Sequence, residues 1–308
     1  MRKLRVCALF VFTGLHSLPL AGAPEEQTFR SDAQYVAVDV QVLSDETPVT
    51  GLQVGDFRVW DKGHPQRIST LGFDELDLDL LVLLDVSGST TSPRQVMLLS
   101  AAEAMSHLYF RDRVGLLAFN LEPFLVAPLT WDRMEIIHQL RQLPPPEGGT
   151  ELNTSIRDGV EYLKRYSRPG ARRVIVVLTD NVAQKTSSDR QVEYDLWEAD
   201  AVLSAILFKT NASGGVADVR KFVKATGGEA LEWNPGKLPL VELFERIRKR
   251  YVLMYRAPQS RPGEVHHIRV DLGSEAKRRI KNLQIRARKG YISGRPGSEA
   301  RKTLLSAQ

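Results

Sequence analysis

The sequence is poor in cysteine and histidine. Its 308 residues include one cysteine, Cys7, and six histidines. Cys7 lies in an N-terminal segment that we expect to be removed, so the mature chain would have no disulfide and no cysteine-ligated metal. The fold must therefore be stabilised by a hydrophobic core, and a hydrophobic content of 43% is ordinary for a globular protein that buries one.

The N-terminal apolar stretch, residues 6–20, is too short for a comfortable membrane span. Arg2, Lys3 and Arg5 precede it, and the small residues 21–23 follow it, which is the pattern of a secretory signal. We therefore expect a signal peptide over residues 1–23. The protein would be secreted, periplasmic or part of the cell envelope, with no stable membrane span after cleavage. The alternative is a membrane anchor that stays attached.

Basic residues are concentrated at the C-terminal end. The whole chain has a formal net charge of +5, whereas the segment from Arg246 onward contains 17 Lys and Arg against 4 Asp and Glu. Such a segment can contact an acidic protein surface, lipid or nucleic acid. It has few aromatic side chains for base stacking, so we expect no nucleic-acid partner. We favour a solvated β-rich segment, or one that docks on the acidic domain before it.

Both flanks of the mature chain are rich in predicted strands. Residues 35–43 alternate between apolar and polar side chains, which is typical of a half-buried strand. Further short strands are predicted at 56–60, 66–71, 251–256, 265–271 and 283–292. We expect the N-terminal segment 24–75 and the C-terminal segment 251–293 to pair as a small β-sandwich-like unit, followed by a disordered tail over 294–308.

Strands alternate with helices in the segment 76–250. Its first strand, 76–85, ends in a continuous apolar run, as expected for a parallel strand covered on both faces. Other strands are predicted at 113–119, 123–127, 174–178, 202–208 and 229–232. One helix is predicted to begin at residue 92, and others are predicted at 131–143, 153–166, 191–199, 216–225 and 238–249. This alternation predicts an α/β fold with a doubly wound, mostly parallel sheet of six strands.

Oxygen-bearing side chains follow the ends of these strands. Asp85, Ser87 and Ser89 come as the first sheet strand ends, Thr150 stands after two glycines and before a helix, and Asp180 ends the strand 174–178. Ligands of open α/β sheets bind at the carboxyl ends of the strands. Two carboxylates and three neutral hydroxyls are hard oxygen ligands of the kind that Mg²⁺ prefers.

In order, spacing and context, these residues resemble the metal-ion-dependent adhesion site of von Willebrand factor A and integrin inserted domains. The resemblance covers about residues 76–250. It implies a divalent cation, Mg²⁺ or alternatively Mn²⁺ or Ca²⁺, and a protein partner that presents an Asp or Glu to it. The implied metal ligands are Asp85, Ser87, Ser89, Thr150 and Asp180.

The β-rich flanks resemble those of a secreted bacterial group described as VWFA-related.

One residue departs from the adhesion-site pattern: Asn181 stands where a glycine commonly follows the second aspartate. This change affects the loop and leaves the ligand itself intact.

An enzymatic role is not expected. No histidine is predicted near Ser87 or Ser89 to act as the base that a nucleophile needs. The glycine between them lacks the lysine of a phosphate-binding loop. Three alternatives to the adhesion module stay open: an envelope structural or assembly factor that binds through its β flanks, with the metal only stabilising the fold; a metal-dependent hydrolase of phosphate esters; and a metal-free relic of the motif.

Overall fold

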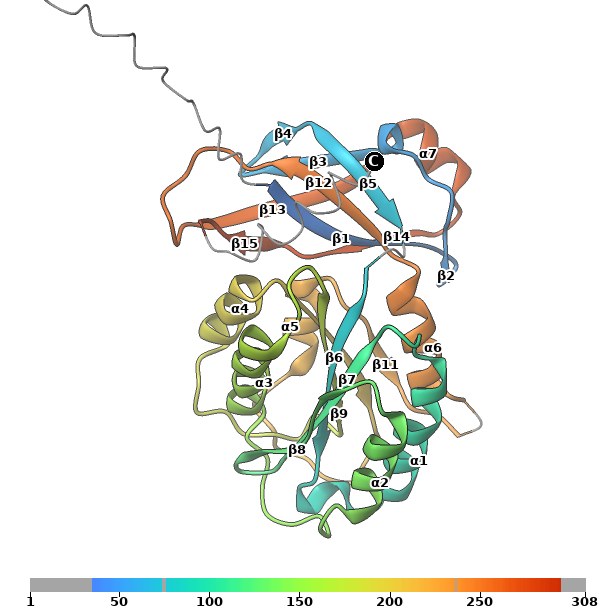
Figure 1. Cartoon of the computed structure of the whole chain (residues 1–308), viewed down its shortest axis with the longest axis vertical. Coiled ribbons are helices and arrows are strands. Elements are labelled where there is room, and N and C mark those ends of the chain that lie inside the picture. The colour runs from blue at the N-terminus through green and yellow to red at the C-terminus, as the bar shows by residue number, and fades with distance from the viewer. Residues whose placement is uncertain (1–34, 74–75, 236, 295–308) are drawn as a thin grey trace, which may run out of the picture. The chain divides into compact units, whose positions relative to one another are not determined.

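The computed structural model describes residues 35–73, 76–235 and 237–294 (Figure 1). The predicted signal peptide and residues 295–308 of the predicted tail lie outside these residues. A six-stranded sheet has the order β11-β10-β9-β6-β7-β8. Its strands are β6 (Leu78–Asp85), β7 (Arg113–Phe119), β8 (Pro123–Thr130), β9 (Arg172–Thr179), β10 (Ala201–Leu207) and β11 (Ala230–Glu232). Neighbouring strands are parallel except β7 and β8, so the predicted fold class is confirmed.

Helices cover both faces of this sheet (Figure 1). One face packs on α1 (Arg94–Ala104), α2 (Arg133–Gln142) and α6 (Pro239–Arg248), and the other on α3 (Leu152–Tyr166), α4 (Asp189–Glu198) and α5 (Val219–Thr226). Short 3-10 turns occur at η2 (Gly88–Thr91) and η3 (Met105–His107). None of the helices within the described residues has the length and apolar character that a membrane span requires.

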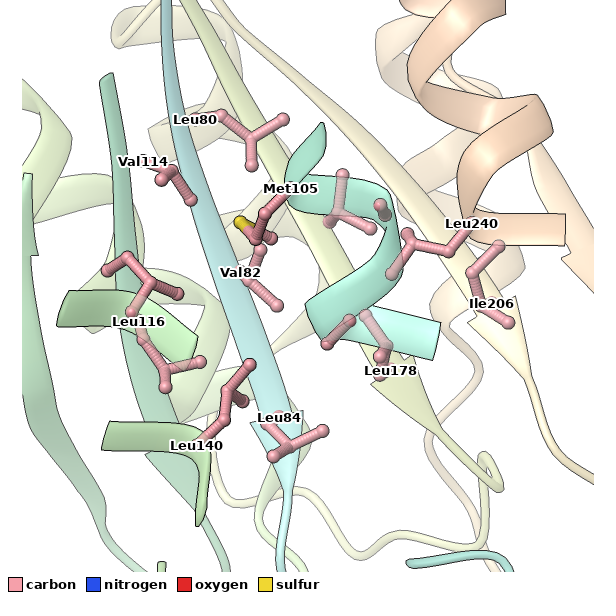
Figure 2. Packing of buried hydrophobic residues seen from close by; sticks show 14 of the residues in the cluster. Leu80, Val82, Leu84, Met105, Val114, Leu116, Leu140, Leu178, Ile206 and Leu240 are labelled. Carbon is pink, nitrogen blue, oxygen red and sulfur yellow. The ribbon is translucent and has the colours of Figure 1, made fainter. Parts of the chain in front are cut away.

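The central strand β6 shows why the sheet is buried on both sides. All of its residues are buried. Leu80, Val82 and Leu84 point to the face of α1, as Figure 2 shows, while Leu81 and Leu83 point to the face of α3. Successive side chains of a strand point to opposite faces, so a strand without polar alternation requires apolar cover on each.

The two chain flanks form a second, all-β unit. One sheet has the order β14-β1-β12-β5 with β2 attached to β1, and the other has the order β15-β13-β3-β4. Their strands are β1 (Tyr35–Ser44), β2 (Thr47–Pro48), β3 (Phe57–Asp61), β4 (His64–Gln66), β5 (Ile68–Phe73), β12 (Tyr251–Arg256), β13 (Val265–Leu272), β14 (Leu283–Ala287) and β15 (Gly290–Ile292), with the turn η1 (Val54–Asp56). Apolar residues of both sheets form one core, which confirms the predicted flanking unit.

Two details of the C-terminal flank differ from the prediction. The single strand expected over 283–292 is two strands, because β14 pairs with β1 and β15 pairs with β13 in the other sheet. The chain crosses between the sheets at Arg288 and Lys289. The amide of Lys289 donates to Ala225 of α5, and Arg288 turns to the Asp200 carboxylate. A short helix, α7 (Ser274–Arg279), was not predicted.

Much of the basic C-terminal segment is neutralised within the chain. Arg246 and Arg286 both pair with the buried Glu229, at 2.5 and 2.6 Å. Arg248 pairs with Asp112, which is also buried. The excess of positive charge from residue 246 onward therefore serves, in these residues, to dock the segment on acidic groups earlier in the chain.

Candidate functional site

Three loops meet at the carboxyl ends of the central strands: one follows β6, one precedes α3 and one follows β9. Backbone hydrogen bonds join them. The amide of Gly88 in the first loop donates to the Gly148 carbonyl in the second, at 2.9 Å. The amide of Gln184 in the third loop donates to the Thr150 carbonyl, also at 2.9 Å. The three predicted segments are therefore neighbours in space.

The first loop fixes the Asp85 carboxylate from both sides. Its Oδ1 accepts hydrogen bonds from the Ser87 amide at 3.0 Å and from the Ser87 hydroxyl at 2.6 Å. Its Oδ2 accepts one from the Thr179 hydroxyl at 2.6 Å. The Ser87 and Ser89 hydroxyl oxygens are 3.2 Å apart. Asp85 is 2% exposed and Ser87 is 1% exposed, so this oxygen cluster is held rigidly in the protein.

The second loop contains two glycines, and the first of them has a backbone conformation that favours glycine. Gly148 has a φ of 71°, in the left-handed region that glycine adopts without steric cost. A Cβ on Gly149 would stand 3.2 Å from Cδ2 of Leu121, so a side chain there would push Leu121 away. The loop then delivers Thr150, which is 3% exposed, to the N-terminus of α3.

The third loop holds the Asp180 carboxylate, which is partly exposed. Its Oδ1 accepts a hydrogen bond from the Val182 amide at 3.1 Å, and its Oδ2 accepts one from the Thr210 hydroxyl at 2.8 Å.

Asn181 adopts the conformation that explains the usual glycine at this position. Its φ is 60°, in the left-handed region that asparagine tolerates better than most residues. Its side chain also joins the loop to α5: Oδ1 accepts from the Val219 amide at 2.9 Å, and Nδ2 donates to Asp218 at 3.2 Å. The departure from the motif therefore preserves the loop and ties it to a helix.

Burial raises the pKa of Asp85 to about 6, although the hydrogen bonds from Ser87 and Thr179 act in the opposite direction. The negative charge of Asp180 makes a small contribution to this raised pKa. Within the described part of the chain, neither carboxylate forms an ion pair with a lysine, arginine or histidine. Two nearby carboxylates with no cationic side chain favour binding of a cation.

The donor set fits a hard divalent cation. The site offers carboxylate and hydroxyl oxygens and no sulfur or imidazole, which is the chemistry that Mg²⁺ and Mn²⁺ prefer over softer metals. No group of three or more His, Cys, Asp or Glu suited to a metal occurs in the described ranges. A cation here would therefore depend on Ser87, Ser89 and Thr150 as well as on the two aspartates.

Two threonines of the site, Thr179 and Thr210, were assigned no role in the sequence analysis. Thr179 orients Asp85, and its Oγ1 also accepts the Asn181 amide at 3.0 Å, so it links the first and third loops. Thr210, from the loop after β10, orients Asp180. A hydroxyl next to Asp180 was a visible signal for Thr179. Nothing in the sequence spacing indicated Thr210, because it reaches the site from a fourth loop.

Within the described residues, the side-chain partners of the Ser87 hydroxyl are Asp85 and Ser89, and no histidine is among them. His266 is buried in the β unit instead, with its Nδ1 2.7 Å from the Asp61 carboxylate.

Residues 80–183 match the family model of the von Willebrand factor type A domain. No curated protein matches the sequence at a significant level. Among solved structures, BatB from Bacteroides thetaiotaomicron is 15% identical over 55% of this chain and 97% of its own, with a TM-score of 0.45. A von Willebrand factor type A protein from Catenulispora acidiphila is 12% identical over 86% of this chain and 74% of its own, with a TM-score of 0.46.

A proximal thread matrix protein from the mussel byssus, with zinc in its MIDAS motif, is 16% identical over 57% of this chain and 48% of its own, with a TM-score of 0.43. At identities of 12–16%, the likeness to these structures is one of fold only. The family match spans all five predicted ligand positions, so residues 80–183 of this chain are similar to a von Willebrand factor type A domain, as the sequence motif predicted.

Proposed function

We propose that this chain is an exported, non-enzymatic protein-binding module that holds one divalent cation, with Mg²⁺ preferred, at Asp85, Ser87, Ser89, Thr150 and Asp180. A cation bound there supplies a coordination position for an Asp or Glu carboxylate of a partner protein. Hydrogen bonds within the chain hold the Asp85 and Asp180 carboxylates and the Ser87 hydroxyl in place. The proposed export rests on the N-terminal signal pattern.

One observation carries the proposal. Asp85 is a buried carboxylate whose pKa is raised to about 6, beside a second carboxylate, with neutral hydrogen-bond donors and no positive side chain paired to it. A protein of this design is destabilised by its own charge at neutral pH. Binding a divalent cation removes this penalty, which explains why such an arrangement is useful.

The test is metal binding by the full chain, followed with Mn²⁺ through the relaxation of water protons and with Mg²⁺ through the melting temperature. We expect a metal-dependent rise in melting temperature, since a ligand at a hundred times its Kd stabilises a fold by about 2.7 kcal/mol. Ser89→Ala and Thr150→Ala should weaken binding. Ser92→Ala is the matched control, because Ser92 is exposed and lies just beyond the site. Equal Mn²⁺ binding by Thr150→Ala and the control would contradict the proposed ligand set.

Partner capture tests the second half of the proposal. The full chain, immobilised in Mg²⁺, should retain a protein from envelope extracts and release it with chelator. Asp180→Ala should abolish this capture.

A second candidate function is partner binding through the β flanks, which a buried ion pair joins to the central sheet. Arg172 of β9 pairs with Asp39 of β1 at 2.9 Å, and both side chains are buried. If capture survives Asp180→Ala and chelator while the melting temperature falls, the flanks bind the partner and the metal only stabilises the fold.

A further inference from the structure

An exposed leucine stands directly beside the proposed cation site. Leu121 is 57% exposed, and its side chain lies where a Cβ on Gly149, the residue before Thr150, would meet it. Its Cδ2 would be 3.2 Å from a Cβ at Gly149, and its Cδ1 would be 4.0 Å from one at Gly148. A partner segment that reaches the proposed cation beside Thr150 would therefore meet an apolar side chain that has more than half of its surface in water.

The turn that carries Leu121 is fixed by Asn120. The Asn120 side chain accepts a hydrogen bond from the Glu122 amide at 3.2 Å and donates to the Glu147 carbonyl at 3.4 Å. The Asn120 carbonyl accepts the Glu151 amide at 2.8 Å. Leu121 therefore stands on a turn bound to the Thr150 loop, and a partner that contacts it need not order the turn first.

A second exposed apolar residue lies on the Asp180 side of the site. Val216 is 62% exposed, and its amide donates to the Ala183 carbonyl at 2.9 Å. The same loop contributes Thr210, whose hydroxyl holds Asp180. An exposed apolar residue therefore follows each side of the site: Leu121 lies next to the second loop, and the backbone of Val216 is bonded to the third.

Charge limits what else a partner can present on the Leu121 side. The Asn120 side chain bonds to the backbones of Glu122 and Glu147, and both of these acidic residues are exposed. They would repel a second acidic side chain next to the one that faces the cation. A run of acidic residues, or a polyphosphate chain, is therefore a poor match for this side of the site.

We propose that the partner segment is a peptide in which a single acidic residue is flanked by apolar residues, and that Leu121 selects the apolar neighbour. This inference rests on the proposed function, because it takes the acidic residue to face the cation. The occupant is a protein segment of defined chemistry, one carboxylate with an adjoining aliphatic side chain, and Leu121 is its specificity-determining contact.

The test uses three synthetic peptides and the full chain with saturating Mg²⁺, with binding followed by NMR titration. The peptides are acetyl-Gly-Leu-Asp-Leu-Gly-amide, its Ser-Asp-Ser counterpart and its Leu-Asn-Leu counterpart, which has no carboxylate. We expect the Leu-Asp-Leu peptide to bind about fivefold more tightly than the Ser-Asp-Ser peptide, as partial burial of a leucine provides.

Leu121→Ala should abolish this preference, and Leu121→Met should retain most of it. Leu99→Ala is the matched control, because Leu99 is 59% exposed but belongs to α1. Mn²⁺ binding, measured separately, should be the same in all of these variants.

Each outcome decides between the two proposals. If both aspartate peptides bind equally, or if the preference survives Leu121→Ala, the inference on Leu121 is wrong and the cation-dependent function stands. If Mn²⁺ binds but neither aspartate peptide binds better than the asparagine peptide, the proposed function fails and this inference fails with it. Loss of the preference in Leu121→Ala alone, with Mn²⁺ binding unchanged, supports both.

Discussion

The substitution Asp85→Asn should make the metal-free protein more stable while it abolishes stabilisation by Mg²⁺. Asparagine has nearly the same shape as aspartate and no charge. Its amide nitrogen can donate to the Thr179 hydroxyl oxygen, which lies 2.6 Å from Oδ2 of Asp85. Its carbonyl oxygen can still accept the bonds from Ser87. The variant therefore removes the charge and retains most of the packing.

The magnitude follows from the pKa of Asp85, which burial raises from 3.8 to about 6. Because the neutral form is favoured in the fold, the free energy of unfolding of the metal-free protein falls as pH rises from 3.8 to about 6, and stays low above that. A shift of about two pKa units corresponds to about 3 kcal/mol. Rearranging the Thr179 hydrogen bond costs about 1 kcal/mol, so the variant should gain about 2 kcal/mol above pH 6.

The assay is urea unfolding of both proteins at pH 7.5 and pH 4, in chelator and in Mg²⁺. We expect the variant to be more stable than the natural protein in chelator at pH 7.5, about equal to it at pH 4, and indifferent to Mg²⁺. Ser92→Ala is again the control, and it should respond to Mg²⁺ as the natural protein does. A variant that is less stable than the natural protein in chelator at pH 7.5 would refute the argument that Asp85 carries an unmet charge.

Three further predictions concern the scaffold. Arg172→Met removes the guanidinium from the buried Asp39 carboxylate, so the free energy of unfolding in urea should fall by about 3–5 kcal/mol. The double variant Arg172→Met/Asp39→Leu should lose less, and equal losses in the two variants would contradict a charge effect. Gly228→Ala places a Cβ against the backbone of β10, so the free energy of unfolding should fall by about 3 kcal/mol and the melting temperature with it. An unchanged melting temperature would show that the backbone moves aside easily. Burial opposes ionisation of Asp189, but hydrogen bonds from Lys185 and its neighbours lower its pKa to about 2, so its contribution to stability is present above pH 4 and lost as pH falls through 2. In Lys185→Met, NMR titration should find a higher pKa for Asp189.

Most of the fold could be predicted because its signals are local. The apolar run of β6 correctly predicted cover on both faces of that strand. The alternation of residues 35–43 predicted a half-buried strand, and this was wrong: β1 is buried on both faces, because its polar side chains are covered too, Asp39 by its ion pair with the buried Arg172. The pairing of the two flanks was predictable only as an association of β-rich ends. Which strand pairs with which depends on side chains far apart in sequence. Arg288 illustrates this, because it pairs with Asp200 at the point where one predicted strand divides between two sheets.

The site was predictable to the extent that its residues stand at strand ends. Topology brings the carboxyl ends of parallel strands together, so Asp85 and Asp180 could be placed near each other without knowledge of any side-chain contact. Thr210 could not be found in this way. It follows β10 at a position set by the path of its own loop, and only the hydrogen bond to Asp180 identifies it.

The site and the scaffold treat buried charge in opposite ways. At the amino ends of the central strands, buried carboxylates are paired with arginines: Asp79 with Arg113 and Arg168, at 2.7 and 2.8 Å. Burial alone would raise the pKa of Asp79, but those bonds outweigh it and lower the pKa. At the carboxyl ends, Asp85 is equally buried and receives only hydroxyl and amide donors, so its pKa is raised. The same sheet thus neutralises one carboxylate within the chain and leaves the other to be neutralised from outside, and this contrast is the physical reason to place binding at that end.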